Sequence, residues 1–279
     1  MHPTLDSAKQ AAIEQWTSDP CGSAEGDTGL GTREYFLDLI AMRDGYAPWM
    51  ARALDYAGSA GLRVLDVGCG QGIDVARYAQ AGAAVTGIDL TPRHVELARA
   101  HVAALGLSAQ IEQADAERLR FPDASFDRVS SNGVLHHTPD MPAALAEIRR
   151  VLRPGGEARI IVYNRNSLHY WVDLVLGAGI LKGELIRERS MAGVLSTRVE
   201  RSSIGARPLV RVYTRRTLER LLPEVGFSSV RTEVHHFHPD DAFPTRLLVR
   251  RFPRLRERLP SEAIGRRAGW YVVAFARRG

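Results

Sequence analysis

Two patterns of apolar and polar residues alternate through the middle of the chain. Short apolar runs predict buried strands, and segments with an apolar residue every three or four positions predict helices between them. The predicted strands are 63–67, 84–89, 109–114, 126–131 and 157–163, and the predicted helices are 71–81, 92–105 and 140–152. Strands that alternate with helices favour a mostly parallel sheet with helices on both faces.

The same alternation of helix and strand patterns occurs near the C-terminus. Residues 217–225 predict an amphipathic helix that ends at Gly226. A strand is predicted near 228–237, and the segment 271–276 predicts a final strand. These late elements complete the predicted sheet.

Two further segments fall outside the alternation. The first 58 residues hold amphipathic pieces that are interrupted by Asp19-Pro20-Cys21-Gly22 and by a Gly/Thr-rich loop at 26–32, a pattern that suits a helical cap. Both this cap and a helical insertion after the fifth strand can close over the carboxyl ends of the strands, where open α/β sheets bind ligands. The predicted organisation is a cap or lid at 1–58, a core at 59–165, an insertion over the active site at 166–210 and a C-terminal completion of the sheet at 211–279.

A glycine-rich turn connects the first predicted strand to the helix that follows it. Gly68, Gly70 and Gly72 alternate with other residues, so the backbone can take positive φ and a ligand can approach it without interference from a Cβ atom. Nucleotide-binding dehydrogenases use a similar strand, turn and helix. The turn alone therefore leaves two classes of cofactor open.

Acidic residues on three successive strands add to this signal. Asp66 lies on the first strand beneath the turn, where its carboxylate can support the loop or meet a cationic amine. Asp89 ends the second strand, where it can accept both hydroxyls of a ribose in either class of cofactor. Asp115 follows the third strand and is placed to accept a hydrogen bond from the amine of an adenine. The fourth strand opens into a loop from Asn132 to His137.

Taken in order, five motifs resemble the class I S-adenosylmethionine-dependent methyltransferases, and more narrowly their ubiquinone/menaquinone-type, small-molecule group. The motifs are Val64–Gly72, Gly87–Leu90, Ala114–Glu117, Phe126–Asp127 and Val151–Gly156. The resemblance implies a Rossmann-like, seven-stranded sheet with a reversed last strand, and S-adenosyl-L-methionine as cofactor with S-adenosyl-L-homocysteine as product. The cofactor-binding residues that it implies are Asp66, Gly68, Cys69, Gly70, Gly72, Asp89, Leu90, Asp115, Ala116 and Asn132.

The N-terminal segment resembles the lid of a bacterial subgroup of these enzymes. It carries Trp16, Tyr35 and Arg43, and such a lid would exclude water and hold the acceptor in line with the sulfonium. Tyr35 and Arg43 are also candidates for binding the cofactor carboxylate, Arg43 by a bidentate fork. The alternative is that Trp16 and Tyr35 only pack the cap onto the core.

Candidate residues for the acceptor side follow the fourth and fifth strands. His136 is the first choice for a catalytic base, oriented by Tyr35, because related small-molecule methyltransferases place a working histidine at this position. The alternative is that His136 only supports its loop. The predicted substrate-binding residues are Trp16, His137, Tyr163, Arg165, His169 and Tyr170. No metal is expected, because no set of carboxylates and Asn of the catechol type can be assembled.

Composition limits the class of protein further. The chain has 279 residues, which suits one large domain with a cap. The N-terminus shows no signal-peptide pattern, and the least polar stretch, 168–181, is too short to span a bilayer. Cys21 and Cys69 have no neighbours at the spacing of zinc ligands. We expect a cytoplasmic protein of small-molecule or secondary metabolism, either a monomer or a homodimer.

Charge is distributed unevenly along the chain. Residues 1–150 contain 13 Lys and Arg and 20 Asp and Glu, a net of −7, whereas 151–279 contain 24 and 12, a net of +12. The densest basic cluster is Arg250–Arg258. A basic half could attract an anionic partner, but arginines that alternate with apolar residues are also typical of solvated helix faces. Nucleic acid is not expected as an acceptor.

The sequence therefore predicts a methyltransferase that acts on a small-molecule acceptor by in-line transfer, with oxygen or nitrogen favoured and carbon possible. One alternative is an NAD(P)-dependent oxidoreductase on the same core. A second is a non-catalytic module that binds nucleic acid or protein through its basic half.

Overall fold

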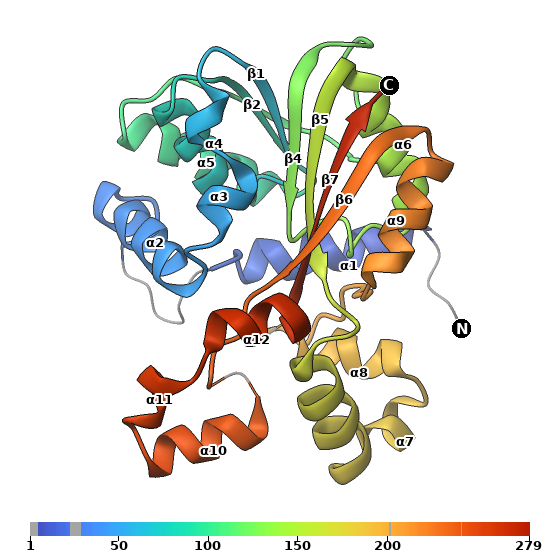
Figure 1. Cartoon of the computed structure of the whole chain (residues 1–279). Coiled ribbons are helices and arrows are strands. Elements are labelled where there is room, and N and C mark those ends of the chain that lie inside the picture. The colour runs from blue at the N-terminus through green and yellow to red at the C-terminus, as the bar shows by residue number, and fades with distance from the viewer. Residues whose placement is uncertain (1–4, 23–28, 201, 241) are drawn as a thin grey trace.

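Seven strands form a single sheet in the order β3-β2-β1-β4-β5-β7-β6 in a computed structural model (Figure 1). The structure describes residues 5–22, 29–200, 202–240 and 242–279. The strands are β1 (Arg63–Val67), β2 (Ala84–Asp89), β3 (Gln110–Gln113), β4 (Phe126–Asn132), β5 (Leu152–Tyr163), β6 (Phe227–His235) and β7 (Tyr271–Arg278). Strand β7 runs antiparallel to both β5 and β6, and the other pairings are parallel. The predicted sheet and its reversed last strand are confirmed.

Helices cover both faces of this sheet, as predicted. Helices α4 (Ile73–Gln80) and α5 (Pro92–Ala104) pack on one face, where Tyr78 and Val95 join a buried cluster with Val64 and Val85. Helices α6 (Met141–Val151) and α9 (Arg215–Glu224) pack on the other face. There the fully buried Ile148 and Leu222 lie in one apolar cluster with the strand residues Leu65 and Ile160, which holds the sheet between two apolar layers.

Strand β5 begins five residues earlier than predicted. Leu152 pairs with Phe126 directly after α6 ends, and the register then shifts before Arg128 pairs with Glu157. The residues between bulge out of the ladder, and Gly155 has a φ of 76°, which favours glycine. The helix therefore ends just before the Pro-Gly-Gly stretch, as predicted, and this stretch lies in the irregular first part of the strand.

The N-terminal cap consists of α1 (Leu5–Ser18), α2 (Arg33–Tyr46) and α3 (Met50–Leu54), which confirms its helical character. Figure 1 shows α1 crossing below the lower end of the sheet, where the parallel strands end. Part of the Gly/Thr-rich loop predicted at 26–32 lies outside the described residues. The Thr32 hydroxyl accepts a hydrogen bond from the backbone N–H of Tyr35 at 3.2 Å and so begins α2.

Two helical segments lie beyond the same end of the sheet. The predicted insertion after β5 contains the π-helix η2 (His169–Leu181), α7 (Glu184–Glu188) and α8 (Met191–Arg198). A second segment between β6 and β7 contains α10 (Phe243–Arg251), α11 (Leu255–Arg258) and α12 (Ser261–Ala268), which were not predicted. The dense arginines at 246–258 obscured the apolar periodicity of α10, so the C-terminal part does more than complete the sheet.

Candidate active site

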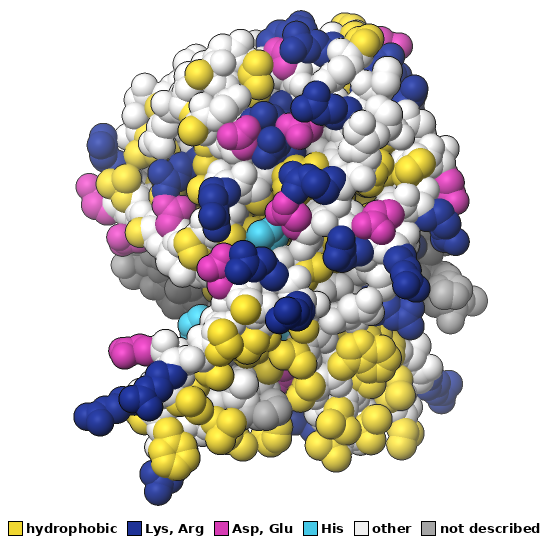
Figure 2. Space-filling view, viewed as in Figure 1, with side chains coloured by type: hydrophobic (Ala, Val, Ile, Leu, Met, Phe, Trp, Pro, Cys, Tyr) yellow, Lys and Arg dark blue, Asp and Glu magenta, His cyan; other side chains and the backbone are white. Residues whose placement is uncertain are grey.

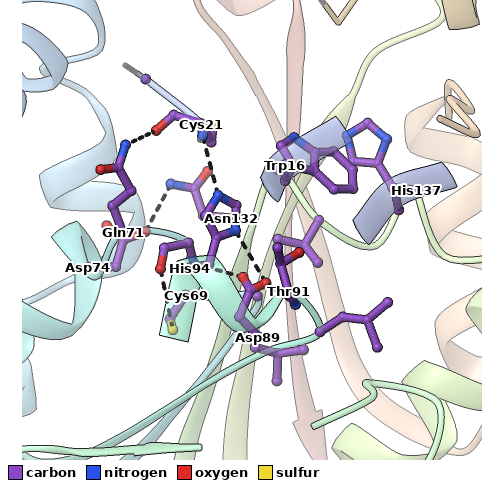
Figure 3. Close-up of a pocket in the computed structure, with 18 of the residues that line it drawn as sticks. Trp16, Cys21, Cys69, Gln71, Asp74, Asp89, Thr91, His94, Asn132 and His137 are labelled. Carbon is purple, nitrogen blue, oxygen red and sulfur yellow. Dashed lines mark hydrogen bonds and ion pairs between the residues drawn. The ribbon is translucent and has the colours of Figure 1, made fainter. Parts of the chain in front are cut away.

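A cavity of about 460 Å³ lies at the carboxyl ends of β1, β2 and β4, and the N-terminal cap forms part of its wall. Its volume falls within the usual range for small-molecule sites. Figure 3 shows the cap residues Trp16 and Cys21 facing core residues such as Asp89 and Asn132 across this space. Of the predicted site residues, those that line the cavity are Trp16, Arg43, Gly68, Cys69, Gly70, Asp89, Leu90, Asp115, Ala116, Asn132, His137 and Tyr163.

The glycine turn has the backbone that the sequence predicted. Gly68, Gly70 and Gly72 have φ values of 75°, 53° and 84°. A Cβ atom on Gly68 would overlap the side chain of Val134, whereas the Cβ position of Gly70 meets nothing within 4 Å. Gly72 lies outside the cavity, where an added Cβ would approach Ala98 of α5 at 3.1 Å. The turn thus offers an open cradle of main chain to a ligand at Gly70, while Gly72 serves helix packing.

Asp89 lines the cavity and has three hydrogen-bond partners. Its carboxylate accepts hydrogen bonds from the backbone N–H groups of Gly70 and Thr91, both at 2.9 Å, and lies 3.2 Å from His94 Nδ1. Burial alone would raise the pKa of Asp89, but these partners hold it below the ordinary value. Asp89 is therefore a buried anion that fixes the glycine turn and presents a carboxylate to the cavity.

The predicted acid Asp66 lies beneath the turn and does not line the cavity. One of its oxygens accepts a hydrogen bond from the Ser130 hydroxyl at 2.8 Å, and the other has no partner among the described residues. Burial, and then the nearby charge of Asp74, raise the pKa of Asp66 to about 8. Burial therefore favours the protonated form of Asp66 at neutral pH.

A charged cluster that was not predicted in full occupies the wall beside Asp66. Asp74, in the first turn of α4, accepts hydrogen bonds from Arg43, from the Tyr56 hydroxyl at 2.5 Å and from Asn132 Nδ2 at 3.1 Å. Burial would raise the pKa of Asp74, but the Arg43 charge and these hydrogen bonds lower it below its ordinary value. Arg43 and Asn132 line the cavity as predicted, but the guanidinium of Arg43 is paired with Asp74.

Asp115 and Ala116 line the cavity at the end of β3, but Asp115 already has partners. Its carboxylate accepts from Lys9 Nζ at 2.6 Å and from the backbone N–H of Glu117 at 2.9 Å. Lys9 also pairs with the Glu117 carboxylate. This pairing connects α1 to the predicted adenine end of the site, and nothing in the sequence indicated Lys9.

Hydrogen bonds fasten the cap to the glycine turn. The Gln71 side chain donates to the carbonyl of Cys21 at 2.7 Å and accepts from the Tyr35 hydroxyl at 2.6 Å. The backbone N–H of Cys21 donates to His94 Nε2 at 3.3 Å, so His94 connects the cap to Asp89 (Figure 3). Tyr35 does not line the cavity and contacts Gln71, so the structure does not bring it to His136 as predicted.

His136 and His137 have different environments. His136 is fully buried outside the cavity lining, between the rings of His137 and Tyr163 at centroid distances of 4.1 and 3.9 Å. Neither of its ring nitrogens has a partner among the described residues, and burial lowers its pKa well below the ordinary value. The role of His136 as a catalytic base stays a prediction. Its buried position outside the cavity lining does not favour that role.

His137 does line the cavity. Its Nδ1 lies 2.7 Å from the carbonyl oxygen of Leu209, which fixes the ring, and Trp16 meets the ring edge to face at a centroid distance of 4.7 Å. Burial lowers the pKa of His137, although the Glu200 charge and the Leu209 hydrogen bond oppose the shift. The lowered pKa favours a neutral ring, and the Nε2 atom of His137 lies 3.5 Å from the Glu200 carboxylate, which also lines the cavity.

Glu200 also lines this side of the cavity, and no sequence motif indicated it. Its carboxylate accepts from the Tyr163 hydroxyl at 2.9 Å and lies 3.5 Å from His137 Nε2. A carboxylate and a neutral ring nitrogen both accept hydrogen bonds, so a proton donor or a cation between them would stabilise the contact. Within the described part of the chain, the ligand atoms of His136, His137 and Glu200 lie within 4.8 Å of one another and could hold a metal ion.

Three predicted substrate residues lie outside the cavity lining. The backbone N–H of Arg165 donates to the carbonyl of Tyr213, and Tyr170 is buried in the apolar cluster of the insertion. His169 packs against Trp270 and lies 3.4 Å from Asp173. His169 and Tyr170 therefore pack within the insertion, and Arg165 follows Asn164, whose backbone N–H donates to the carbonyl of Trp270.

Comparisons with known proteins agree with this geometry. Residues 65–160 match the profile of a family described as a methyltransferase domain. The ubiquinone biosynthesis O-methyltransferase of Aromatoleum aromaticum is 42% identical over 123 residues, which cover 44% of this chain and 52% of that protein. The enzyme of the same name from Mesorhizobium japonicum is 28% identical over 194 residues, which cover 65% and 76% of the two chains. The chain thus spans about half the length of the first of these curated relatives.

A solved structure shares the fold. The S-adenosylmethionine-dependent methyltransferase of Mesorhizobium loti superimposes with a TM-score of 0.53 at 22% identity, covering 81% of this chain and 96% of that one. Residues 65–160 therefore carry a methyltransferase domain, and the chain shares the fold of that solved structure. The family resemblance predicted from the five motifs is confirmed.

Proposed function

We propose that this protein transfers the methyl group of S-adenosylmethionine to a small-molecule acceptor, with an acceptor hydroxyl favoured, an amine second and carbon possible. The observation that carries the proposal is the composition of the cavity. One end holds the glycine turn and Asp89, and the other holds His137 beside Glu200. A donor site and a proton acceptor thus face one space.

The chain's own residues suit the donor. The open main chain at Gly70 and the anionic Asp89 would hold the methionine and ribose parts, while Asp115 and Ala116 lie where an adenine would reach. When bound, S-adenosylmethionine supplies a methyl group that is activated by a positively charged sulfur. Arg43 and Asn132 remain candidates for the methionine end, although both are paired with Asp74.

His137 is placed to take a proton from the acceptor. With its Nδ1–H donating to Leu209, its Nε2 atom can accept a hydrogen from an acceptor hydroxyl or amine. The Glu200 carboxylate 3.5 Å away would stabilise the imidazolium that forms. Trp16 packs against His137 and forms part of the wall that excludes water.

Neither rival function is favoured. An oxidoreductase would share the glycine turn and Asp89, but residues 65–160 match the methyltransferase family. A non-catalytic binding module would not need a cavity with an anchored cofactor acid and a buried base. The names of the curated relatives, which describe O-methylation in ubiquinone biosynthesis, support the preference for an oxygen acceptor.

The setting of the enzyme is part of the same proposal. We expect a cytoplasmic enzyme of small-molecule or secondary metabolism that acts as a monomer or homodimer and does not bind nucleic acid. No helix among the described residues is long and apolar enough to cross a membrane.

Release of S-adenosylhomocysteine tests the function directly. The full chain is incubated with S-adenosylmethionine and a panel of phenols, amines and carbon acids, and product is compared with that of the Asp89→Ala variant. Release that requires both an acceptor and Asp89 supports the proposal. If no acceptor in a broad panel leads to release of S-adenosylhomocysteine, and the protein binds NADH, the proposal is contradicted.

A further inference from the structure

Large apolar side chains are exposed on the two helical segments below the sheet. Figure 2 shows hydrophobic side chains gathered over the lower end of the molecule, where Figure 1 places α7, α8 and α10. Ile186 of α7 is 85% exposed and Leu181 at the end of η2 is 72% exposed. We call the whole set the lower apolar surface, and its members are Trp171, Leu176, Ile180, Leu181, Ile186, Phe243, Leu247, Leu248 and Phe252.

This surface is built by contacts between segments that are distant in sequence. The carboxylate of Asp173 in η2 accepts a hydrogen bond from the backbone N–H of Phe243 at 2.9 Å and lies 3.6 Å from Arg246. These contacts hold the first turn of α10 against η2. Exposed apolar residues of both helices therefore belong to one supported surface.

Basic side chains accompany the apolar ones. The segment 243–258 contains six arginines and one glutamate, and the arginines at 250, 251, 254, 256 and 258 are exposed. Lys182, Arg187 and Arg189 are exposed beside α7. The guanidinium of Arg251 lies 5.0 Å from the ring centre of Phe252, so charge and apolar surface are adjacent.

We propose that the lower apolar surface docks the protein on a lipid bilayer that carries anionic headgroups. Amphipathic helices with aromatic and aliphatic residues on one face and arginines beside them bind in the interfacial layer of a membrane. Aromatic residues such as Trp171 and Phe252 suit the depth of the headgroups, and the arginines are attracted to anionic lipids. The π-helix η2 is too short to span a bilayer, so the docking is peripheral.

The excess of arginine favours a membrane, and not a second copy of the chain, as the binding partner of the lower apolar surface. Two copies that met through this surface would bring two sets of α10 and α11 arginines together, and like charges repel. A bilayer with anionic lipids offers the opposite charge over an extended plane. The proposal does not depend on the transferase activity, because none of these residues lines the cavity.

Flotation with lipid vesicles tests this docking. The full chain is mixed with vesicles of phosphatidylcholine alone or with about one third phosphatidylglycerol, and the bound fraction is measured. We expect binding to the anionic vesicles, weakened by added salt because surface charges are screened. Leu181→Ser with Ile186→Ser should weaken binding at least about tenfold, because two large side chains leave the apolar layer. Arg250→Glu with Arg251→Glu should remove the preference for phosphatidylglycerol.

A matched control separates docking from general surface change. Leu37 is 44% exposed on α2, a helix that Figure 1 shows apart from α7, α8 and α10, so Leu37→Ser should leave vesicle binding unchanged. Circular dichroism and binding of S-adenosylhomocysteine check that each variant is folded. Absence of vesicle binding, or equal losses in Leu37→Ser and the Leu181/Ile186 variant, would overturn the proposal. The proposal would also be overturned if the protein forms a dimer without lipid and Ile186→Ser dissociates that dimer.

Discussion

The two ends of the cavity are constructed differently. The proposed donor end comes from strands that are consecutive along the chain, and its acids lie on the sheet next to a glycine turn with positive φ. The acceptor end joins His137 after β4, Tyr163 at the end of β5 and Glu200 after α8. Local backbone rules determine the donor end, whereas the acceptor end depends on where a helical insertion docks. Evolution can therefore change the acceptor without disturbing the donor.

The largest expected effect lies at the acceptor end. His137→Asn should lower kcat by about 10²–10⁴-fold, because it removes the proposed proton acceptor. The dissociation constant for S-adenosylhomocysteine should stay within about threefold of the wild type, since the donor end is intact. Steady-state kinetics and calorimetry measure the two quantities.

The pH profile and a control histidine sharpen this prediction. Burial lowers the pKa of His137, so its ring stays neutral below the usual range for histidine and wild-type activity should persist at pH 6. Activity should then fall as the pH falls further and the ring is protonated. His238→Asn, at a half-buried histidine outside the cavity, should behave like the wild type. An unchanged kcat in His137→Asn would remove His137 from the mechanism.

The donor end should respond in the opposite way. Asp89→Ala removes a buried carboxylate that accepts from Gly70, Thr91 and His94, so S-adenosylhomocysteine should bind about 100-fold more weakly. Isothermal titration calorimetry measures the loss. Glu96→Ala removes an exposed carboxylate from α5 and should leave binding unchanged. Equal affinities for Asp89→Ala and the wild type would show that the cofactor does not occupy this end.

Asp66 should influence stability and its dependence on pH. Its pKa is raised from 3.8 to about 8, so the folded state holds a proton there that the unfolded state releases. Its contribution to stability is therefore lost as the pH rises from about 4 to 8. Asp66→Asn should raise the free energy of unfolding at pH 8 by at least about 1 kcal/mol, and the gain should shrink towards pH 5. Urea unfolding at both pH values measures this, and a loss of stability at pH 8 would contradict it.

The smallest effect is expected at His136. Its neutral ring packs between two aromatic neighbours and has no hydrogen-bond partner among the described residues, so His136→Gln should change kcat by less than about threefold. The same assay with and without a chelator tests the histidine pair as a metal site. Loss of activity in His136→Gln, together with chelator sensitivity of the wild type, would show that His136, His137 and Glu200 act as metal ligands.

The sequence predicted the sheet and the residues that gather at the glycine-turn end of the cavity, because both depend on local patterns. Strands, glycine turn and the acids at 89 and 115 follow one another at short spacing. Asp74 was within reach of the same reasoning, since it lies in the helix turn that follows the glycines. Lys9 and Glu200 could not be predicted in this way, because they reach the cavity only when α1 and the insertion pack against the core. His136 was preferred over His137 on the family resemblance, and the sequence alone could not show which of these two adjacent side chains lines the cavity.

The most direct test of the central claim is calorimetric titration of the full chain with S-adenosylhomocysteine and, separately, with NADH. We predict one site for S-adenosylhomocysteine that is lost in Asp89→Ala and kept in His137→Asn, and no binding of NADH. Binding of NADH without binding of S-adenosylhomocysteine would contradict the assignment of the cavity to a methyl donor.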